Sequence, residues 1–393
     1  MENRHRARSA QDAAPGPPRH LYVHVPFCRA RCDYCAFYSE PLTVEAYLDA
    51  YVEALLAEWR CEQARWGIGR LETVYLGGGT PSLLGELRLQ RLLEPLQPQL
   101  TQHAEVTIET NPEDVTPTYA DWVAHWRPAL RVSLGVQSFS ARLRRELGRR
   151  GDVDPVVAYR RLRDAGVTNL SVDLIFAIPG QGVAEIDEEL RRIGELQPEH
   201  VSWYELDIAE GGALERRLRG RRAPSTDVDG SAELYRRLVH GLERLGYHWY
   251  EVSNFARSGH QARHNVAYWR GQSYLGLGPA AVSTVGELRW TNEPDVRSYL
   301  AWAGQPTAAS SSPERQWEEL DEVVRARERL MLAARTGAAV ELAAVAPALD
   351  SAALEPLAEA GFILLSGGKL RVARKGRYVA NEVCVRLFRD FAF

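Results

Sequence analysis

A regular alternation of short apolar strands and amphipathic helices runs from residue 21 to residue 206, and it narrows the range of folds sharply. Six runs have the length and apolar content of buried strands, and between them apolar residues recur at helical spacing. The predicted strands are Leu21–Val25, Thr73–Leu76, Glu105–Glu109, Arg131–Leu134, Asn169–Ile178 and His200–Leu206. Strands separated by helices form parallel β/α units. Six units predict an α/β fold built as a partial (β/α)6 barrel, open rather than closed with eight strands.

Polar and glycine-rich motifs follow the ends of these predicted strands. A cysteine-containing loop follows the first strand, and Gly77-Gly-Gly-Thr-Pro81 follows the second. Glu109-Thr-Asn-Pro112 ends the third strand, and Gly135-Val-Gln-Ser-Phe139 ends the fourth. In β/α barrels the carboxyl-terminal ends of the strands meet at one rim, which carries the active site. The sequence therefore predicts one site at this rim.

Three of the five cysteines, Cys28, Cys32 and Cys35, fall within eight positions at the spacing C-x3-C-x2-C. Three thiolates on one loop can bind three corners of a four-iron, four-sulfide cluster and leave the fourth iron open to a small molecule. A zinc site or ordinary buried cysteines are the alternatives on spacing alone. Zinc would need a fourth Cys or His ligand, and His20 and His24 precede the loop, on or beside the first strand.

Composition sets broad limits on function and location. The net charge of −4 gives no overall basic field of the kind that binds nucleic acid. Contents of 45% hydrophobic and 25% charged residues are ordinary for a soluble globular protein, and no apolar run approaches the ~20 residues of a membrane span. The remaining cysteines, Cys61 and Cys384, do not suggest a disulfide framework, so a cytoplasmic location is predicted.

The composition also changes along the chain and suggests domain boundaries. The first 20 residues are rich in Arg, Ala and Pro and contain no apolar stretch, which predicts a disordered tail. Pro306–Pro313 is rich in Ala, Ser and Pro, which predicts a linker. Helical patterns followed by a glycine-containing hairpin signal predict a small helix-plus-wing module at the end. The predicted divisions are tail 1–20, barrel 21–206, an extension 207–305, linker 306–319 and module 320–393.

Five motifs in this order resemble the radical S-adenosylmethionine (SAM) superfamily. They are Tyr-x-His-x-Pro-Phe-Cys, Gly-Gly-Gly-Thr-Pro, Glu-x-Asn-Pro, Gly-Val-Gln-Ser-Phe and Asp-Leu-Ile-x-x-x-Pro-Gly-Gln. Within it, the chain is similar from about Leu21 to the C-terminus to the oxygen-independent coproporphyrinogen III oxidase-like family, which includes the HemW-like haem chaperones. The resemblance implies that the three cysteines hold a [4Fe–4S] cluster whose free iron binds SAM. Electron transfer from that cluster would then cleave SAM to a deoxyadenosyl radical.

The same resemblance implies a set of SAM-binding residues. Gly78, Gly79 and Thr80 match the turn that lies along SAM, and Glu109 matches an acidic position that pairs with its ammonium group or ribose. The other matching positions, some of which serve a second SAM in the relatives, are Gln137, Arg149, Asp173, Tyr22 and Tyr34. Without the resemblance, Arg149 would be assigned to a solvated helix face and Tyr22 to the core of the first strand.

Phe37 separates the functional alternatives. Family members that act as decarboxylases carry a fourth cysteine at this position, whereas HemW-like proteins lack it. This favours a haem chaperone that binds haem and delivers it to a haemoprotein or membrane-bound respiratory enzyme. Its other expected partners are an electron donor and, transiently, the membrane. The alternatives are a radical SAM enzyme that decarboxylates a porphyrinogen and a HemN-like methyltransferase. A nucleic-acid-modifying enzyme, suggested by the basic run Arg216–Arg222, is the weaker reading because such runs are usually solvated.

The stretch Arg263-His-Asn-Val-Ala-Tyr-Trp269 resembles a segment of HemW-like proteins and has suitable chemistry for haem. An imidazole can ligate haem iron, so His264 is the candidate ligand and His260 the second choice. Tyr268 and Trp269 offer aromatic surface to a porphyrin, and Arg263 could pair with a propionate. The segment 276–283 departs from the family by lacking a histidine, so a different haem pocket is expected.

Overall fold

The computed structural model describes residues 16–126, 130–149, 151–219, 228–308 and 310–389, and its main sheet has twelve strands. The six predicted strands form a continuous parallel run in chain order, which confirms the partial barrel. They are β1 (His20–Val25), β4 (Leu71–Gly78), β5 (Leu100–Thr110), β6 (Leu130–Gln137), β7 (Leu170–Phe176) and β8 (His200–Glu205). The structure extends most of them beyond the predicted bounds, because the flanking polar residues also join the ladder.

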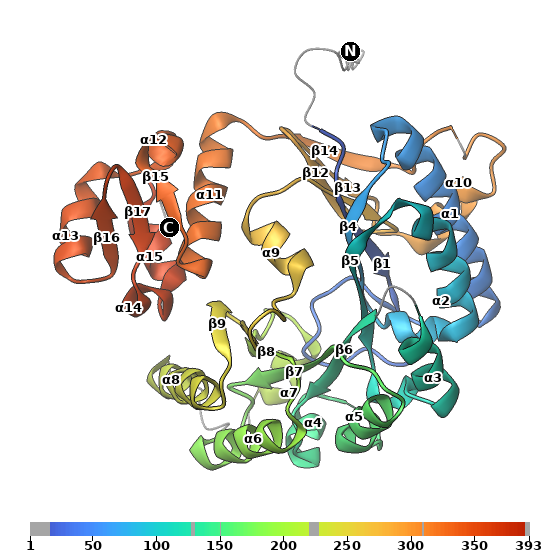
Figure 1. Cartoon of the computed structure of the whole chain (residues 1–393), viewed down its shortest axis with the longest axis horizontal. Coiled ribbons are helices and arrows are strands. Elements are labelled where there is room, and N and C mark those ends of the chain that lie inside the picture. Colours follow the sequence, from blue (N-terminus) through green and yellow to red (C-terminus); the bar gives the residue numbers. More distant parts are fainter. Residues whose placement is uncertain (1–15, 127–129, 150, 220–227, 309, 390–393) are drawn as a thin grey trace.

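Helices cover the outer face of this sheet, as Figure 1 shows. Thr116, Ser140 and Asp154 start three of them by accepting a hydrogen bond from a backbone N–H of the first turn. The helices are α1 (Ala46–Trp66), α2 (Gly85–Leu93), α3 (Pro117–His125), α4 (Ala141–Glu146), α5 (Pro155–Asp164) and α6 (Val183–Leu196), with 3-10 turns at Pro81–Leu84, Glu94–Gln99 and Pro112–Asp114.

Alternation along the strands gives the barrel two different faces. Residues such as Val74, Val132 and Val172 pack in the core beneath the helices. The residues between them face inward and bond to one another across strands: the Tyr75 hydroxyl donates to Glu109 Oε1 at 2.8 Å. The interior of the barrel is therefore polar, which prepares it to hold a polar ligand.

The sheet continues past β1 through four strands that follow the barrel in sequence. These are β11 (Tyr274–Leu277), which is parallel to β1, and the antiparallel β12 (Val282–Val285), β13 (Leu288–Asn292) and β14 (Arg315–Glu319). Helix α10 (Val296–Ala303) joins β13 to β14. The predicted linker 306–319 is thus wrong in its last residues. Those residues pair with β13 because Arg315 lies between two buried carboxylates on α1.

The opposite edge carries β10 (Asn254–Ala256) and β9 (His248–Glu251), which are antiparallel, and helix α8 (Val228–Arg244), which packs on α6. Two shorter helices lie near the barrel interior: α7 (Ala213–Leu218) and α9 (Arg263–Trp269). In Figure 1, α9 lies between β4 and the C-terminal helices, and it contacts both β4 and α11. The segment that resembles HemW-like proteins therefore fills the open side of the barrel.

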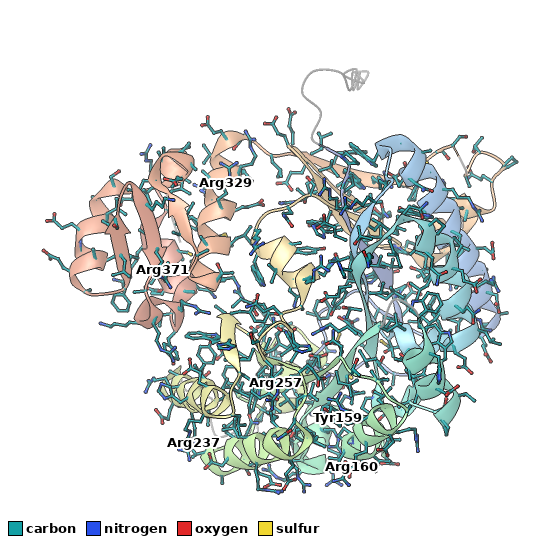
Figure 2. The ribbon with its side chains drawn as sticks, viewed as in Figure 1. Tyr159, Arg160, Arg237, Arg257, Arg329 and Arg371 are labelled. Atoms are coloured by element: carbon teal, nitrogen blue, oxygen red, sulfur yellow. The ribbon has the colours of Figure 1, made fainter. Side chains whose placement is uncertain are left out.

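The C-terminal residues form the predicted helix-plus-wing module with a core of its own. Its wing is the hairpin β16 (Ile363–Ser366) and β17 (Lys369–Val372), joined by β15 (Ala339–Glu341). Its helices are α11 (Glu322–Thr336), α12 (Leu342–Val345), α13 (Leu354–Glu359), α14 (Arg374–Arg377) and α15 (Ala380–Leu387), with 3-10 turns at Ala346–Ala348 and Ser351–Ala353. Figure 2 shows Arg329 and Arg371 of this module on its surface, and Arg237 on α8.

The predicted tail, residues 1–20, lies for the most part outside the described residues, which begin at residue 16. His20 belongs to β1, so the barrel starts one residue earlier than the sequence predicts. Among the helices that the structure describes, none is both long and apolar enough to cross a membrane.

Candidate functional site

The cysteine loop connects two short paired strands, β2 (Phe27–Cys28) and β3 (Glu40–Pro41), just beyond the end of β1. The backbone holds it closed, since Leu42 N donates to Cys28 O at 2.8 Å and Cys35 N donates to Cys32 O at 3.2 Å. The charged residues of the loop are anchored rather than free. Arg29 pairs with the buried Asp114 at 2.6 Å, which fixes the loop to the turn after β5.

Helix α7 packs against the other side of this loop. Leu214 N donates to Asp33 O at 3.0 Å, and the Arg217 guanidinium pairs with the Asp33 carboxylate and donates to the Glu146 carbonyl. The described part of the basic run 216–222 is therefore partly structural, and its remaining residues lie outside the described ranges. The charge pattern of this run predicts a solvated loop, and the contact with Asp33 shows that Arg217 instead supports the cysteine loop.

The three cysteines share one loop beside a cationic side chain. All are free thiols and all are partly accessible. In the part of the chain that the structure describes, no three His, Cys, Asp or Glu side chains converge as ligands of one ion would. Burial raises the pKa values of Cys32 and Cys35, and the Arg149 guanidinium opposes this at Cys32. A cation beside the loop favours the thiolate form, which is the form that binds iron.

The glycine turn after β4 lies directly against the cysteine loop. Gly79 N donates to Val25 O and Thr80 N donates to Phe27 O, both at 2.8 Å. A Cβ at Gly79 would stand 2.7 Å from these two carbonyl oxygens, so only glycine fits. Gly78 has φ +107°, and its amide donates to Glu109 Oε2 at 3.2 Å. The structure thus joins the turn, the cysteine loop and Glu109, as the motifs predicted.

Glu109 lies deep in the barrel but keeps part of its surface accessible. Withdrawal from solvent is the main reason that its pKa rises to about 7, and the Tyr75 hydroxyl and the Gly78 amide oppose the rise. A carboxyl whose pKa lies near 7 binds a proton or a cationic partner readily at neutral pH. An ammonium or sulfonium ligand would therefore be stabilised beside it.

Asp173 occupies the equivalent place on β7. Ser133 Oγ donates to its two carboxylate oxygens at 2.8 and 3.0 Å, and desolvation raises its pKa. Arg131 lies below on β6, with its side chain fully buried. Its positive charge favours the ionised forms of both Glu109 and Asp173. Sequence reasoning missed Arg131, although its place two residues before Ser133 on one strand predicts the same face.

Gln137 and Arg149 lie at the end of β6. Gln137 adopts a left-handed conformation with φ +64°. Arg149 donates to Gly135 O at 3.2 Å and to the Asn111 side chain, and it also hydrogen-bonds to Tyr34. Arg149 is therefore directed toward the cysteine loop rather than toward solvent, in agreement with the resemblance.

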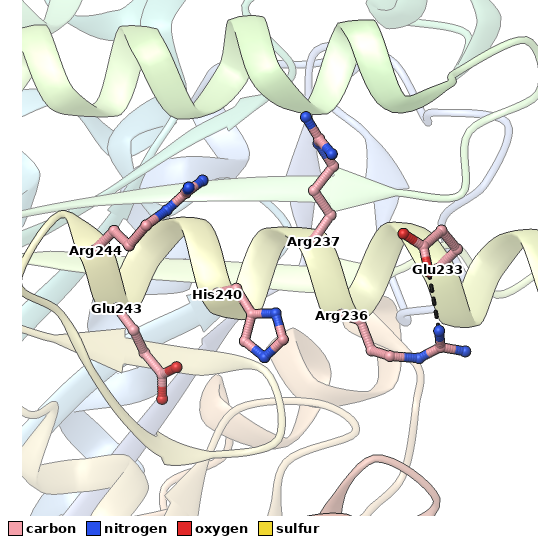
Figure 3. A pocket seen from close by; sticks show the side chains of 6 residues that line it. All are labelled: Glu233, Arg236, Arg237, His240, Glu243 and Arg244. Atoms are coloured by element: carbon pink, nitrogen blue, oxygen red, sulfur yellow. Dashed lines mark hydrogen bonds and ion pairs between the residues drawn. The ribbon is translucent and has the colours of Figure 1, made fainter.

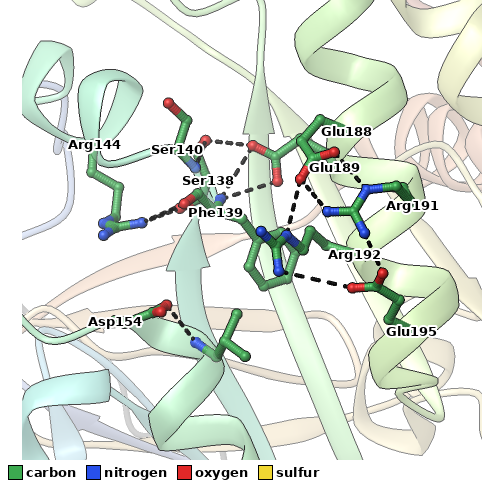
Figure 4. Close-up of polar contacts among 11 residues, drawn as sticks. Ser138, Phe139, Ser140, Arg144, Asp154, Glu188, Glu189, Arg191, Arg192 and Glu195 are labelled. Carbon is green, nitrogen blue, oxygen red and sulfur yellow. Dashed lines mark hydrogen bonds and ion pairs between the residues drawn. The ribbon is translucent and has the colours of Figure 1, made fainter.

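A carboxylate on α6 bonds the residues that directly follow Gln137, and Figure 4 shows its contacts with Ser138 and Phe139. Glu189 accepts from the Ser138 hydroxyl and from Phe139 N at 3.0 Å. Arg144 donates to the Ser138 and Phe139 carbonyl oxygens at 2.8 and 3.0 Å. Burial raises the pKa of Glu189 to about 7, although these donors oppose it. Glu189 and Arg144 act by positioning Ser138 and Phe139.

Tyr22 faces the barrel interior rather than the core beneath the helices. Its hydroxyl shares a hydrogen bond of 2.9 Å with His24 Nδ1, and its ring stacks on Tyr75 with centroids 6.2 Å apart. The second His24 nitrogen, Nε2, is 3.0 Å from Tyr38 O. His24 also packs on Gly78, where a Cβ would stand 2.4 Å from the ring. Tyr22 is thus linked to the glycine turn through His24.

The candidate haem ligand His264 lies at the opposite end of the barrel from the cysteines. Its Nδ1 is 2.7 Å from Thr73 Oγ1, and Thr73 is five residues before Gly78 on β4, which corresponds to about 16 Å of strand. The His264 side chain is 3% exposed, and burial lowers its pKa to about 3. Ligation of haem by His264 would therefore require α9 to move. His260 lies in the loop before α9 and is partly accessible.

The other residues of that segment also have protein partners. Arg263 donates through its backbone amide to Glu105 Oε2 at 3.0 Å and through its side chain to the His103 carbonyl. Trp269 lies under the Arg335 guanidinium, 5.0 Å from the ring centre. Tyr268 differs from both because it stacks on Tyr274, with centroids 4.1 Å apart, and lines a cavity.

That cavity has a volume of about 540 Å³ and opens beside the cysteine loop. Aromatic rings dominate its lining, and Phe37 stands at its edge with 68% of its surface exposed. A second hollow of about 790 Å³ lies on the outer face of α8 (Figure 3). Its charged side chains are largely engaged, as in the Arg236–Glu233 pair at 2.9 Å, so we assign it no ligand.

Comparison with known proteins agrees with this geometry. The sequence matches the Radical SAM superfamily over residues 22–193, the part that carries the cysteine loop and the inward-facing motif residues. The solved structure of coproporphyrinogen III oxidase (HemN) from Escherichia coli, described as a radical SAM enzyme, superposes with a TM-score of 0.80. At 23% identity, with 95% of this chain and 90% of that one covered, the match shows a shared fold. This is a radical SAM protein.

Curated relatives narrow the class to one family. The protein named heme chaperone HemW in Mycobacterium tuberculosis (strain ATCC 25618 / H37Rv) is 34% identical to this chain, over 94% of each. The protein of the same name in Bacillus subtilis (strain 168) is 30% identical, over 92% of this chain and 97% of the relative. The protein of that name in Escherichia coli (strain K12) is 36% identical over 67% of this chain and 70% of its own. The chain belongs to the HemW family.

Membership in the superfamily implies a [4Fe–4S] cluster and SAM, and the residues present fit both. Cys28, Cys32 and Cys35 would hold the cluster, which when bound supplies the electron that cleaves SAM. The glycine turn offers a close approach to the backbone, and Glu109 and Asp173 offer carboxylates to a cationic ligand. These features lie on one rim, where the sequence predicted them.

Proposed function

We propose that this protein is a haem chaperone, which binds haem and transfers it to a haemoprotein or respiratory enzyme. The observation that carries the proposal is Phe37, in a chain of the HemW family. An exposed phenylalanine stands where a decarboxylase of the wider family would have a fourth cysteine, and it borders an aromatic cavity. An apolar ring exposed at the edge of a cavity suits a flat apolar ligand better than a fourth thiol would.

In this proposal the rim residues bind SAM and keep the cluster loop ordered. Gly78, Gly79 and Thr80 lie along SAM, Glu109 pairs with its ammonium group or ribose, and Gln137 and Arg149 complete the site. Tyr22 and Tyr34 enclose it, and Asp173 serves the same ligand or a second SAM. Haem is the cargo, and the free cysteines suit a reducing cytoplasm, from which transfer to a membrane-bound enzyme would need only transient membrane contact.

The test is anaerobic reconstitution with iron and sulfide, followed by haem titration with the Soret band as readout. Parallel reactions with SAM, a reductant and coproporphyrinogen III measure decarboxylation. We expect haem to bind stoichiometrically, to pass to an apo-haemoprotein, and to leave coproporphyrinogen unchanged. Catalytic decarboxylation, or no haem binding, would contradict the proposal. A His264→Ala variant decides that residue separately: unchanged haem binding removes it as the ligand.

A further inference from the structure

The aromatic cavity beside the cysteine loop has the features of a porphyrin site. Rings form most of its wall, and they come from four separate segments of the chain. These residues are Tyr22, His24, Phe37, Tyr38, Tyr268 and Tyr274. Its volume of about 540 Å³ falls within the ~300–1,000 Å³ typical of small-molecule pockets.

Two pairs of rings give the wall flat surfaces. Tyr268 and Tyr274 stack at 4.1 Å between centroids, and His24 and Tyr38 at 6.2 Å, each with 29° between the ring planes. Flat aromatic surfaces bind flat aromatic ligands, because stacking adds to the burial of apolar area. The exposed Phe37 at the edge would also be covered by such a ligand.

One charged side chain stands among these rings. Of the residues that line the cavity, Arg289 on β13 is the one with a permanent charge. Its Nε donates to Thr284 Oγ1 at 3.1 Å, and its two terminal nitrogens donate to the Glu328 carboxylate at 2.6 and 2.9 Å. Glu318 lies near the same guanidinium at 3.7 Å. Arg289 thus binds a carboxylate of α11 through two parallel hydrogen bonds, which is the geometry in which arginine binds carboxylates in general.

We propose that the cavity holds the porphyrin macrocycle and that Arg289 binds one of its carboxylates, which displaces Glu328. The inference rests on the proposed function, since it gives a place to the cargo. In this proposal the porphyrin contacts Arg289 and the two ring pairs. Arg263 and Trp269, which the sequence suggested for this role, have other partners. Because Glu328 belongs to α11, cargo binding would release one contact between the extension of the main sheet and the C-terminal module.

Opposite changes in two variants test the exchange. With metal-free protoporphyrin IX as the probe and its fluorescence as the readout, Arg289→Gln should weaken binding about tenfold, the loss of one charge-assisted pair. Glu328→Gln should tighten it several-fold, because the competing carboxylate is gone. The dimethyl ester of the same porphyrin has no free carboxylates, so neither substitution should change its binding.

Arg325→Gln is the matched control. Arg325 pairs with Glu287 at 2.7 Å, so it also joins α11 to the sheet, but it does not line the cavity. We expect this variant to bind both porphyrins as the unaltered protein does. Equal effects of Arg289→Gln on acid and ester, or no tightening in Glu328→Gln, would overturn the proposal. If the unaltered protein binds haem but not the metal-free porphyrin, the cavity assignment fails while the chaperone stands; if it binds neither, the proposed function itself fails.

Discussion

Two groups of acidic and basic side chains lie inside this protein, and they differ in what surrounds them. The first joins α1 to β14 and consists of Glu58, Glu62 and Arg315, with side chains that are 0%, 0% and 2% exposed. The second lines the barrel and consists of Glu109, Asp173 and Arg131. Both carboxylates of the second group retain accessible surface, although they lie deep in the protein.

The first group is bonded almost completely by the protein itself. Tyr299 and Gly278 donate to one oxygen of Glu58, at 2.6 and 2.8 Å, and Asn292 donates to the other at 2.7 Å. Among the residues described, Arg315 of the first group leaves one guanidinium nitrogen, Nη1, without a hydrogen-bond partner, whereas Arg131 of the second group leaves two, Nε and Nη1. A buried carboxylate that the protein bonds on both oxygens stabilises the fold, whereas carboxylates that keep open surface are available to a ligand.

The largest expected effect is loss of stability from the first group. Glu58→Ala leaves Arg315 buried with half of its charge partners, and removing one member of a buried pair typically costs ~3–5 kcal/mol. Urea unfolding followed by circular dichroism measures it. The control is Glu53→Ala on the same helix: its exposed pair with Arg91 should contribute less than ~1 kcal/mol. Equal effects of the two substitutions would remove the distinction between buried and open groups.

The second group should show the reverse behaviour, with a large effect on ligand and a small one on stability. Glu109→Gln keeps the shape but loses the charge, so SAM affinity should fall about tenfold, the typical value of one hydrogen bond to a charged group. Equilibrium dialysis with the reconstituted protein measures this. Glu105→Gln, on the same strand but bonded to the amides of Arg263 and His264, should leave SAM affinity unchanged. A loss of stability in Glu109→Gln as large as in Glu58→Ala would show that both groups are structural.

The pH dependence of stability and of SAM affinity gives a finer test of the second group. The pKa of Glu109 in the folded protein, about 7, is above its ordinary value of 4.5, so the folded state binds the proton more tightly. Its contribution therefore makes the free energy of unfolding fall as pH rises from about 4.5 to about 7, and SAM affinity should rise from pH 6 to pH 8 as the carboxylate ionises. Glu109→Gln should make both profiles less steep than those of the unaltered protein. Glu189, whose pKa also rises to about 7, contributes a similar slope in both proteins and cancels in the difference.

Much of the open site could be predicted because its residues occur in motifs at strand ends. The alternation from 21 to 206 placed the cysteine loop, the glycine turn and Glu109 on one rim, and the parallel sheet confirms it. Local sequence carries this information, since a strand–turn–helix unit is decided within about 30 residues. Arg149 could be assigned to the site only from the resemblance, because the charged run around it has the pattern of a surface helix. In the structure, Arg149 lies near Cys32.

The rest depends on contacts between distant parts of the chain. Arg315 follows an Ala/Ser/Pro-rich stretch, and nothing local shows that it will lie between carboxylates more than 250 residues earlier. The same holds for Arg217, whose partner Asp33 is 184 residues away, and for His264, which pairs with Thr73 across 191 residues. The sequence identified these side chains as charged or polar but could not identify their partners.

The smallest expected effect concerns the edge of the open site, where α7 meets the cysteine loop. Arg217→Gln removes a partly buried pair with Asp33, whose side chains are 28% and 24% exposed, and this should reduce stability by about 1 kcal/mol. The loss should nevertheless be local, so hydrogen exchange in the cysteine loop should quicken while exchange in β5 and β6 stays the same. Arg216→Gln is the control, because Arg216 bonds to the Gly211 carbonyl within its own segment. Faster exchange throughout the barrel would mean that α7 supports the whole fold. A change confined to the loop would mean that α7 supports only the cysteine loop of the open site. The buried group around Glu58 has no such separate support.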